Sequence, residues 1–166
     1  MTRFLYASTM LAWALWLGGL IAMLMFVIQL FGVSHDLGVQ AAPVLFRSFA
    51  MYQLIVGMIA CASGTLLCLV TRRNAHAIMS LLMILSLAAA LLIRKLTVQM
   101  LAIIAAGQSS SSDFLALHIK SNIAYTIAAG LLLIAGIGWA ITSPVRRTPV
   151  GTSPAQDSPA GVGRQF

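Results

Sequence analysis

The stretch that decides the fold runs from Phe4 to Val33 and reads FLYASTMLAWALWLGGLIAMLMFVIQLFGV. It holds no charged side chain, and it exceeds the roughly 20 apolar residues that a helix needs to cross a hydrocarbon core of about 30 Å. It is also much longer than the apolar part of a secretory signal peptide, about 7–15 residues, so we expect it to remain as a membrane anchor. The sequence therefore predicts a transmembrane helix here.

Three further runs of the same kind follow along the chain, at residues 43–70, 77–106 and 114–142. As helices, the four runs would measure roughly 42–45 Å, so we expect them to tilt or to extend into the headgroup layer. They are separated by short polar breaks at residues 34–42, 71–76 and 107–113. Because short connections make consecutive helices antiparallel, we predict an all-α fold, an up-down four-helix membrane bundle that forms one domain over residues 1–142.

The composition agrees with a membrane protein and argues against a nucleic-acid partner. Hydrophobic residues make up 60% of the chain and charged residues only 8%, whereas soluble domains average about 25% charged residues. The net charge of +7 comes from short clusters at the ends of apolar runs, without interleaved aromatic residues. The lipid bilayer is therefore the expected partner, and a homo-oligomer or a membrane protein partner is left open.

The basic clusters also predict the orientation. Arg3, Arg72–Arg73 and Arg146–Arg147 fall on one side of a four-span protein, while the first and third breaks hold no lysine or arginine. Since cytoplasmic segments are enriched in these residues, both termini and the middle break are predicted to be cytoplasmic, in the inner (plasma) membrane. Residues 143–166 are rich in proline, glycine, serine and threonine, and we expect a disordered cytoplasmic tail.

Capping and first-turn residues predict where the second and fourth helices begin. Pro43 suits the first turn of the second helix, where its missing N–H costs nothing. Ser112 is the predicted N-cap of the fourth helix, and Asp113 stands where a negative charge favours the helix dipole.

Small and aromatic residues give expectations for packing. In lipid, small residues let helices approach closely, so four-residue repeats of them predict contact faces. Such faces are expected from residues in the first, second and fourth runs, namely Ala14, Gly18, Ala22, Ala60, Gly64, Ala124, Ala128, Gly130, Gly136 and Gly138. We expect Trp13 and Trp16 to fill the bundle and Trp139 to stand in an interfacial belt.

Ionisable residues at membrane depth are the first candidates for a site, because they are costly there. Arg47 lies near the outer end of the second run, and Arg94 and Lys95 lie in the outer half of the third. Two interpretations stay open for Arg94 and Lys95. Their long side chains extend to the headgroups, or they line an outward-facing cavity together with Gln99, one turn above Lys95.

A polar stripe on the fourth run is the second candidate. At 100° per residue, an arc of about 100° holds His118, Ser121, Asn122 and Tyr125, and Lys120 points the opposite way. The stripe is predicted to face the bundle. His118 is either a hydrogen-bonded packing residue or a ligand of haem b or copper. It is the single metal-ligand candidate, since His35 and His76 lie in breaks on opposite sides, and no cofactor is predicted.

Signatures of soluble enzymes are missing from the sequence. It holds no Walker loop, dinucleotide fingerprint, nucleophile elbow or HExxH motif. With three aspartates and no glutamate, paired-carboxylate catalysis is nearly excluded, and no catalytic residue is predicted. We therefore favour a protein that is not an enzyme, although enzymatic activity is left open.

Three short motifs resemble one family. Residues 16–19 (WLGG), 42–46 (APVLF) and 114–118 (FLALH), the last with Ser121, resemble the transmembrane protein 205-like family of small four-helix membrane proteins. That family looks distantly similar to the copper-resistance D membrane proteins and to the haem-binding protoporphyrinogen oxidase of the bacterial J type. The resemblance implies fold and membrane location and leaves activity open. Only His118 carries over from the histidine-bearing bundles.

These observations lead to one functional hypothesis and two alternatives. The first is a non-enzymatic membrane protein that binds a small molecule or lipid at an outward-facing polar layer. The alternatives are a haem- or copper-binding redox protein with His118 as ligand, and a transporter subunit, for which no inverted repeat or broken helix pair is evident.

Overall fold

The computed structural model describes residues 2–142, except for the side chains of residues 35, 36, 39, 40, 42 and 43. Within this range it contains four helices: α1 Thr2–Val33, α2 His35–Thr71, α3 Asn74–Ala105 and α4 Ser112–Thr142. All four are long and apolar enough to cross a membrane. The predicted all-α membrane four-helix bundle is therefore confirmed, while the predicted tail with Arg146 and Arg147 lies outside the described residues.

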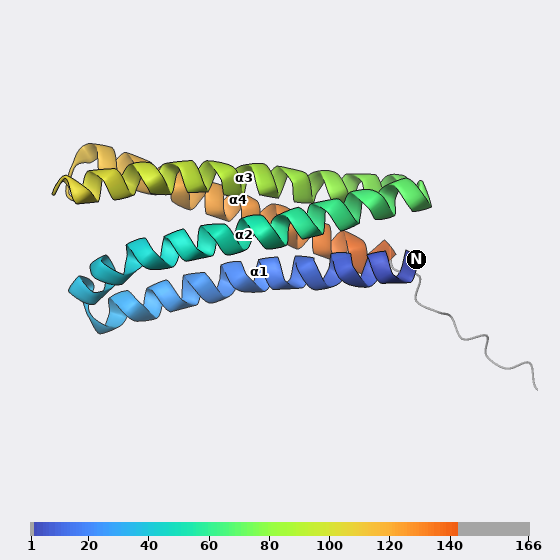
Figure 1. Ribbon diagram of the computed structural model, residues 1–166, viewed down its shortest axis with the longest axis horizontal. Coiled ribbons are helices and arrows are strands. Elements are labelled where there is room, and N and C mark those ends of the chain that lie inside the picture. Colours follow the sequence, from blue (N-terminus) through green and yellow to red (C-terminus); the bar gives the residue numbers. More distant parts are fainter. Residues whose placement is uncertain (1, 143–166) are drawn as a thin grey trace, which may run out of the picture.

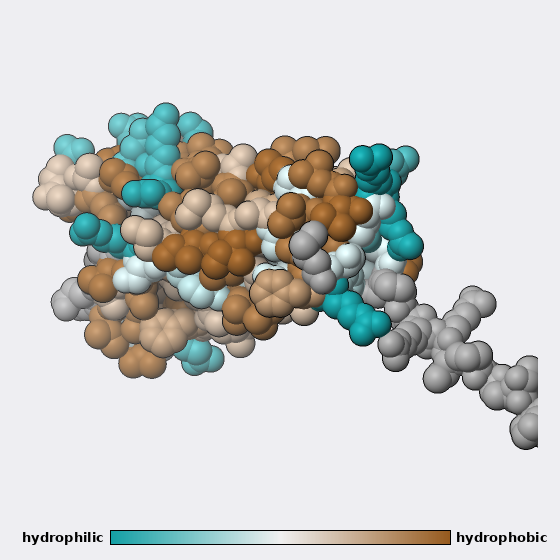
Figure 2. Space-filling view, turned by 45° about the vertical axis from the view of Figure 1, so that its right-hand side comes forward, coloured by the Kyte–Doolittle hydropathy of each residue, from teal (hydrophilic) through white to brown (hydrophobic). Residues whose placement is uncertain are grey.

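The helices run up and down, each packing on the next, and α4 closes the ring on α1 (Figure 1). The start of α1, the α2–α3 turn and the end of α4 lie together at what we call the N-terminal end. The α1–α2 and α3–α4 connections lie at the opposite, far end. Arg3, Arg72 and Arg73 therefore share one end, as the four-span arrangement requires. Figure 2 shows hydrophobic residues over much of the visible surface, with hydrophilic residues gathered toward the two ends.

The connection between α1 and α2 differs from the prediction. Residues 35–42 are helical rather than a break, because Ser34 adopts an extended conformation (φ −160°, ψ 132°) and caps α2 directly after α1 ends. The Ser34 hydroxyl accepts a hydrogen bond from the N–H of Leu37 at 3.4 Å, and its carbonyl accepts one from Gly38 at 3.0 Å. A Cβ on Gly38 would come within 2.6 Å of the Phe31 ring, so glycine permits this tight turn. Pro43 consequently lies about two turns inside α2, not in its first turn.

The start of α4 is displaced by one residue from the prediction. Ser111, not Ser112, is the N-cap. The Ser111 hydroxyl accepts a hydrogen bond from the N–H of Phe114 at 3.2 Å, and the Ser111 carbonyl accepts one from the N–H of Leu115 at 3.1 Å. Ser112 is the first residue of the helix, and Asp113 stands in the first turn as expected.

The small-residue faces of α2 and α4 are largely confirmed, while that of α1 is wrong. Ala60, Gly64, Ala124, Ala128 and Gly136 are buried, Gly138 is half-buried against Met79, and Gly130 is exposed. In α1, Ala14, Gly18 and Ala22 are exposed. That helix buries instead Leu5, Thr9, Ala12, Trp16 and Leu20. Since α1 is apolar all round, its composition does not mark which side meets the other helices.

The tryptophans tie the N-terminal half together. Trp16 is fully buried and Trp13 is half-buried, as predicted. Trp139 is not in a lipid-facing belt, because it is fully buried on the inner face of α4. Its ring stacks on His76 with centroids 4.7 Å apart and meets the edge of Tyr6 at 5.9 Å. His76 therefore lies buried in the first turn of α3 rather than in a break.

Candidate functional site

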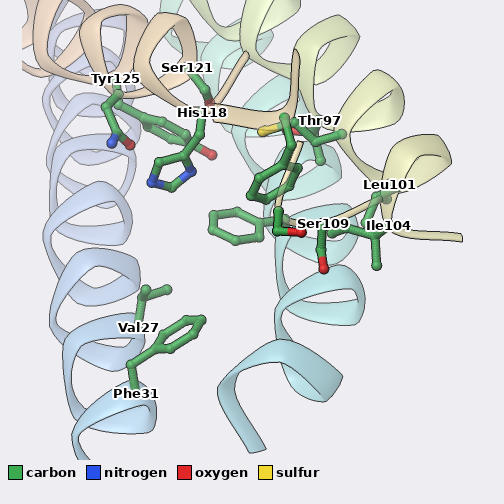
Figure 3. Close-up of a pocket in the computed structure, with 14 residues that line it drawn as sticks. Val27, Phe31, Thr97, Leu101, Ile104, Ser109, His118, Ser121 and Tyr125 are labelled. Atoms are coloured by element: carbon green, nitrogen blue, oxygen red, sulfur yellow. The ribbon is translucent and has the colours of Figure 1, made fainter. Parts of the chain in front are cut away.

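The polar stripe of α4 lines a cavity in the far half of the bundle. His118, Ser121, Asn122 and Tyr125 all border one space of about 570 Å³. In Figure 3, His118, Ser121 and Tyr125 project from α4 toward this space, with Thr97 of α3 beside them and Val27 and Phe31 of α1 across it. The predicted direction of the stripe, toward the bundle, is therefore what the structure shows.

All four helices contribute to this cavity. Besides the α4 residues, the apolar wall comes from Phe46 of α2, Met100, Leu101 and Ile104 of α3, and Phe114 at the start of α4. The connection between α3 and α4 adds the hydroxyl groups of Ser109 and Ser110. The space therefore has an apolar wall, a polar stripe on α4 and hydroxyl groups at its far end.

A second hollow of about 750 Å³ lies between α1 and α4. We call it the α1–α4 groove. One side consists of apolar α1 residues, among them Leu17, Ile21 and Leu24, and the other of α4 residues down to Gly130 and Leu133. Val27, Phe46, His118, Asn122 and Tyr125 border both the groove and the cavity, so the two spaces adjoin.

The groove exists because α1 and α4 meet closely only toward the N-terminal end. There the Trp13 indole donates a hydrogen bond to the carbonyl of Leu132 at 2.7 Å, and its ring lies against Gly136, where a Cβ would collide with it. Tyr6 donates a hydrogen bond to the carbonyl of Trp139 at 3.2 Å. From this contact α4 diverges from α1 toward the far end (Figure 1). The opening is therefore lateral, on the side of the bundle that would face lipid.

The predicted cationic residues do not join the α4 stripe. Arg47, Arg94, Lys95 and Gln99 are exposed, and none of them borders the cavity or the groove. Their positions agree with side chains that extend toward headgroups rather than line a cavity. Lys120 is exposed on α4, as predicted. The structure thus brings together four of the eight predicted site residues.

Two buried polar residues were not among the predicted site residues. Thr97 is buried and borders the cavity. Gln53 of α2 is only 1% exposed, and neither its amide nitrogen nor its amide oxygen has a hydrogen-bond partner among the described residues. The available signal was simple: Gln53 and Thr97 are uncharged polar residues inside apolar runs, where polar groups are costly.

The metal hypothesis rests on His118 alone. Within residues 2–142, no three histidine, cysteine or acidic side chains described by the structure gather as a metal site. The imidazole of His118 lies beside the ring of Phe114, with centroids 6.1 Å apart and planes 15° from parallel. The described residues that border the cavity include no second histidine, and His76 is buried at the N-terminal end.

The chain was compared with models of protein families, with curated proteins and with solved structures, and none of them matches it.

Proposed function

We propose that this four-helix membrane protein is not an enzyme and binds an amphiphilic small molecule or lipid, with its polar head in the cavity and its tail in the α1–α4 groove. The observation that carries the proposal is that His118, Asn122 and Tyr125 border both spaces. A ligand lying across this boundary would meet hydrogen-bonding groups at one end and apolar side chains at the other.

The two ends of this path differ in chemistry. Imidazole, amide and hydroxyl groups on α4 can orient a polar head, and such a small set of polar groups in an apolar pocket is typical of ligand sites. The groove wall on α1 consists of exposed apolar residues such as Ile21 and Leu24. A hydrocarbon tail can therefore enter sideways from the bilayer without crossing a polar surface.

Two layers of arginine residues support a placement of the bundle relative to the hydrocarbon core of the membrane. Arg73, directly before α3, and Arg94 on α3 are 21 residues apart, roughly 31 Å at 1.5 Å per residue, which matches a hydrocarbon core of about 30 Å. Arg47 on α2 and Arg72, directly after α2, are 25 residues apart, roughly 37 Å, a span that an extended arginine side chain can accommodate. The cavity would then lie near headgroup depth and the groove within one leaflet.

The orientation follows from the same cations. Arg3, Arg72 and Arg73 mark the N-terminal end, while Ser34 and residues 106–111 at the far end contain no lysine or arginine. By the positive-inside rule the N-terminal end is cytoplasmic, in an inner (plasma) membrane. The cavity therefore opens on the outer side, and its ligand is an amphiphile of the outer leaflet.

A matched pair of glycine variants tests the proposal. A Cβ on Gly130 or on Gly18 would meet no atom within 4 Å, so a leucine side chain at either position begins in open space. Gly130 borders the groove and Gly18 does not. We expect Gly130→Leu to lose most of the amphiphile that co-purifies with the wild-type protein in lipid nanodiscs, whereas Gly18→Leu retains it. Mass spectrometry of the organic extract gives the amount of each lipid per protein.

The outcomes separate the alternatives. Equal amphiphile content in wild type, Gly130→Leu and Gly18→Leu would show that only surrounding bilayer lipid is carried, and the proposal would fail. A Soret band that disappears in His118→Ala would support the haem alternative instead, and bound copper that disappears in the same variant would support the copper alternative.

A further inference from the structure

Three unpaired cations lie on the outside of α2 and α3, in the far half of the bundle. Arg47, Arg94 and Lys95 are exposed, and none of their side chains has a hydrogen bond or an ion pair in the part of the chain that the structure describes. The sequence offers few carboxylates to neutralise them, since it holds three aspartates and no glutamate. The partner that these charges lack is therefore an anion from outside the chain.

Arg47 and Arg94 lie at nearly the same depth. A Cβ on Gly57 of α2 would lie 3.0 Å from the Leu87 side chain of α3, so these two positions are close to level. Arg47 is ten residues from Gly57 toward the far end, and Arg94 is seven residues from Leu87 in the same direction. At 1.5 Å per residue, the two arginines differ in depth by about 4–5 Å. Arg94 also continues, two turns on, the face of α3 on which Leu87 meets α2.

Arg47 lies on the side of α2 that faces α3. Gly57 faces both neighbouring helices, since a Cβ there would approach side chains of α1 and of α3. Tyr52, which donates a hydrogen bond to the carbonyl of Leu15 in α1, is about 140° from Gly57 around the helix, and Arg47 is about 80° away in the opposite sense. The two arginines therefore flank one outer surface between the helices, which we call the α2–α3 edge.

The α2–α3 edge is apolar on the cytoplasmic side of the arginines. Met51 and Met58 of α2 and Leu91 of α3 are each more than half exposed. In the membrane placement proposed above, the edge thus combines positive charges at headgroup depth with an apolar surface at acyl-chain depth. It lies across the ring of helices from the α1–α4 groove, because α2 packs on α1 and α3 packs on α4.

Phosphate is the anionic group that these arginines suit. Guanidinium N–H groups match the geometry of phosphate oxygens and donate two parallel hydrogen bonds to them. Neighbouring helices are roughly 8–10 Å apart, a gap that two extended arginine side chains can close from both sides. Two like charges repel while they are unpaired, and one phosphate between them offsets that repulsion. Basic sites between transmembrane helices bind anionic lipid headgroups in this way.

We infer that the α2–α3 edge binds the phosphate of an anionic phospholipid of the outer leaflet, held by Arg47 and Arg94, with an acyl chain along Met51 and Leu91. Lys95 adds a third positive charge beside Arg94. This site is separate from the proposed function and uses only its membrane placement. It takes a charged headgroup outside the bundle, whereas no described residue that borders the cavity is lysine, arginine, aspartate or glutamate.

The test measures lipid binding to the full-length protein in a mild non-ionic detergent. Dioctanoyl-phosphatidylglycerol, dioctanoyl-phosphatidylcholine and inorganic phosphate are titrated separately, and native mass spectrometry counts the bound molecules. The wild type should bind one phosphatidylglycerol more tightly than phosphatidylcholine, whose choline the arginines repel. Inorganic phosphate should not bind over the same range, because it gains no apolar contact. Arg47→Gln and Arg94→Gln should each weaken phosphatidylglycerol binding about fivefold.

Lys120→Gln is the matched control. The Ser86 hydroxyl donates a hydrogen bond to the carbonyl of Ala128. Arg94 is eight residues from Ser86 and Lys120 is eight residues from Ala128, both toward the far end, so the two cations are level. Lys120 is exposed on α4, which has no contact with α2 among the described residues. Its loss removes a positive charge at the same depth but away from the α2–α3 edge, so phosphatidylglycerol binding should not change.

The outcomes separate a site from a general attraction to positive charge. Equal losses in Arg47→Gln, Arg94→Gln and Lys120→Gln, or equal binding of the two lipids by the wild type, overturn the inference. Inorganic phosphate that binds as tightly as the lipid, through the same arginines, overturns the assignment to a phospholipid. If one glutamine variant does not fold, the other decides. None of these results depends on Gly130→Leu, so the proposed function can stand or fall separately.

Discussion

The contact between Trp13 and Gly136 is the feature of the bundle most open to a quantitative test. Gly136→Ala places a methyl group where the Trp13 ring lies, so the ring must move. That movement also breaks the 2.7 Å hydrogen bond from the indole to the carbonyl of Leu132. Because this contact holds α1 and α4 together at the N-terminal end, we expect the variant to be destabilised.

The magnitude follows from two destabilising effects and one stabilising effect. Overpacking costs about 1–3 kcal/mol, and a lost interhelical hydrogen bond in a membrane protein about 0.6 kcal/mol. Alanine is favoured over glycine in a helix by about 1 kcal/mol. Gly130→Ala shares this gain without any collision, since nothing lies within 4 Å of its Cβ. The free energy of unfolding of Gly136→Ala should therefore fall about 2–4 kcal/mol below that of Gly130→Ala.

Unfolding in mixed micelles of dodecyl sulfate and a mild detergent, followed by circular dichroism, measures this difference. A double-mutant cycle adds a sharper criterion. In Trp13→Phe the smaller ring leaves room at Gly136, so the cost of Gly136→Ala should shrink in that background. Equal stability of Gly136→Ala and Gly130→Ala, or strict additivity with Trp13→Phe, would refute the packing argument.

Two further predictions concern the N-terminal end and the orientation. The Thr71 hydroxyl lies 2.7 Å from Nδ1 of buried His76. Thr71→Val removes this hydrogen bond and should lower the free energy of unfolding by about 1–2 kcal/mol. The control is Thr126→Val, because the exposed Thr126 hydroxyl forms a hydrogen bond within its own helix. In a cysteine-free background, Gln108→Cys should react with a membrane-impermeant maleimide on intact cells and Asn74→Cys only after lysis; the reverse pattern would contradict the proposed orientation.

The fold was predictable from the sequence because long apolar runs with few charges have few alternatives. The boundaries at the far end were not, since residues 35–42, which include the polar residues His35 and Asp36, are part of the helix that Ser34 caps. The inner face of α1 was not predictable either. When every side of a helix is apolar, small residues such as Ala14 and Gly18 can face lipid while Trp16 faces the bundle.

The site was predictable where one face of a helix is polar and the other faces are apolar. On α4, the stripe from His118 to Tyr125 differs from its surroundings, so one face could be assigned to the interior, and all four of its residues border the cavity. Arg94 and Lys95 could not be assigned in the same way, because a long charged side chain can lie at membrane depth and still reach the headgroups. Thr97 depends on tertiary packing, which brings it to the border of the cavity.

The unequal spacing of α1 and α4 connects stability with binding. Toward the N-terminal end, the Trp13 indole fills the space against Gly136, and the helices interlock. Toward the far end, the groove is bordered by apolar α1 side chains such as Leu24 and by the polar Asn122 of α4, so neither helix gains hydrogen bonds by closing the gap. An amphiphile that satisfies the polar side and fills the apolar side would replace the missing contact. The bundle can therefore keep an open site in one half because the other half supplies the packing that holds α1 and α4 together.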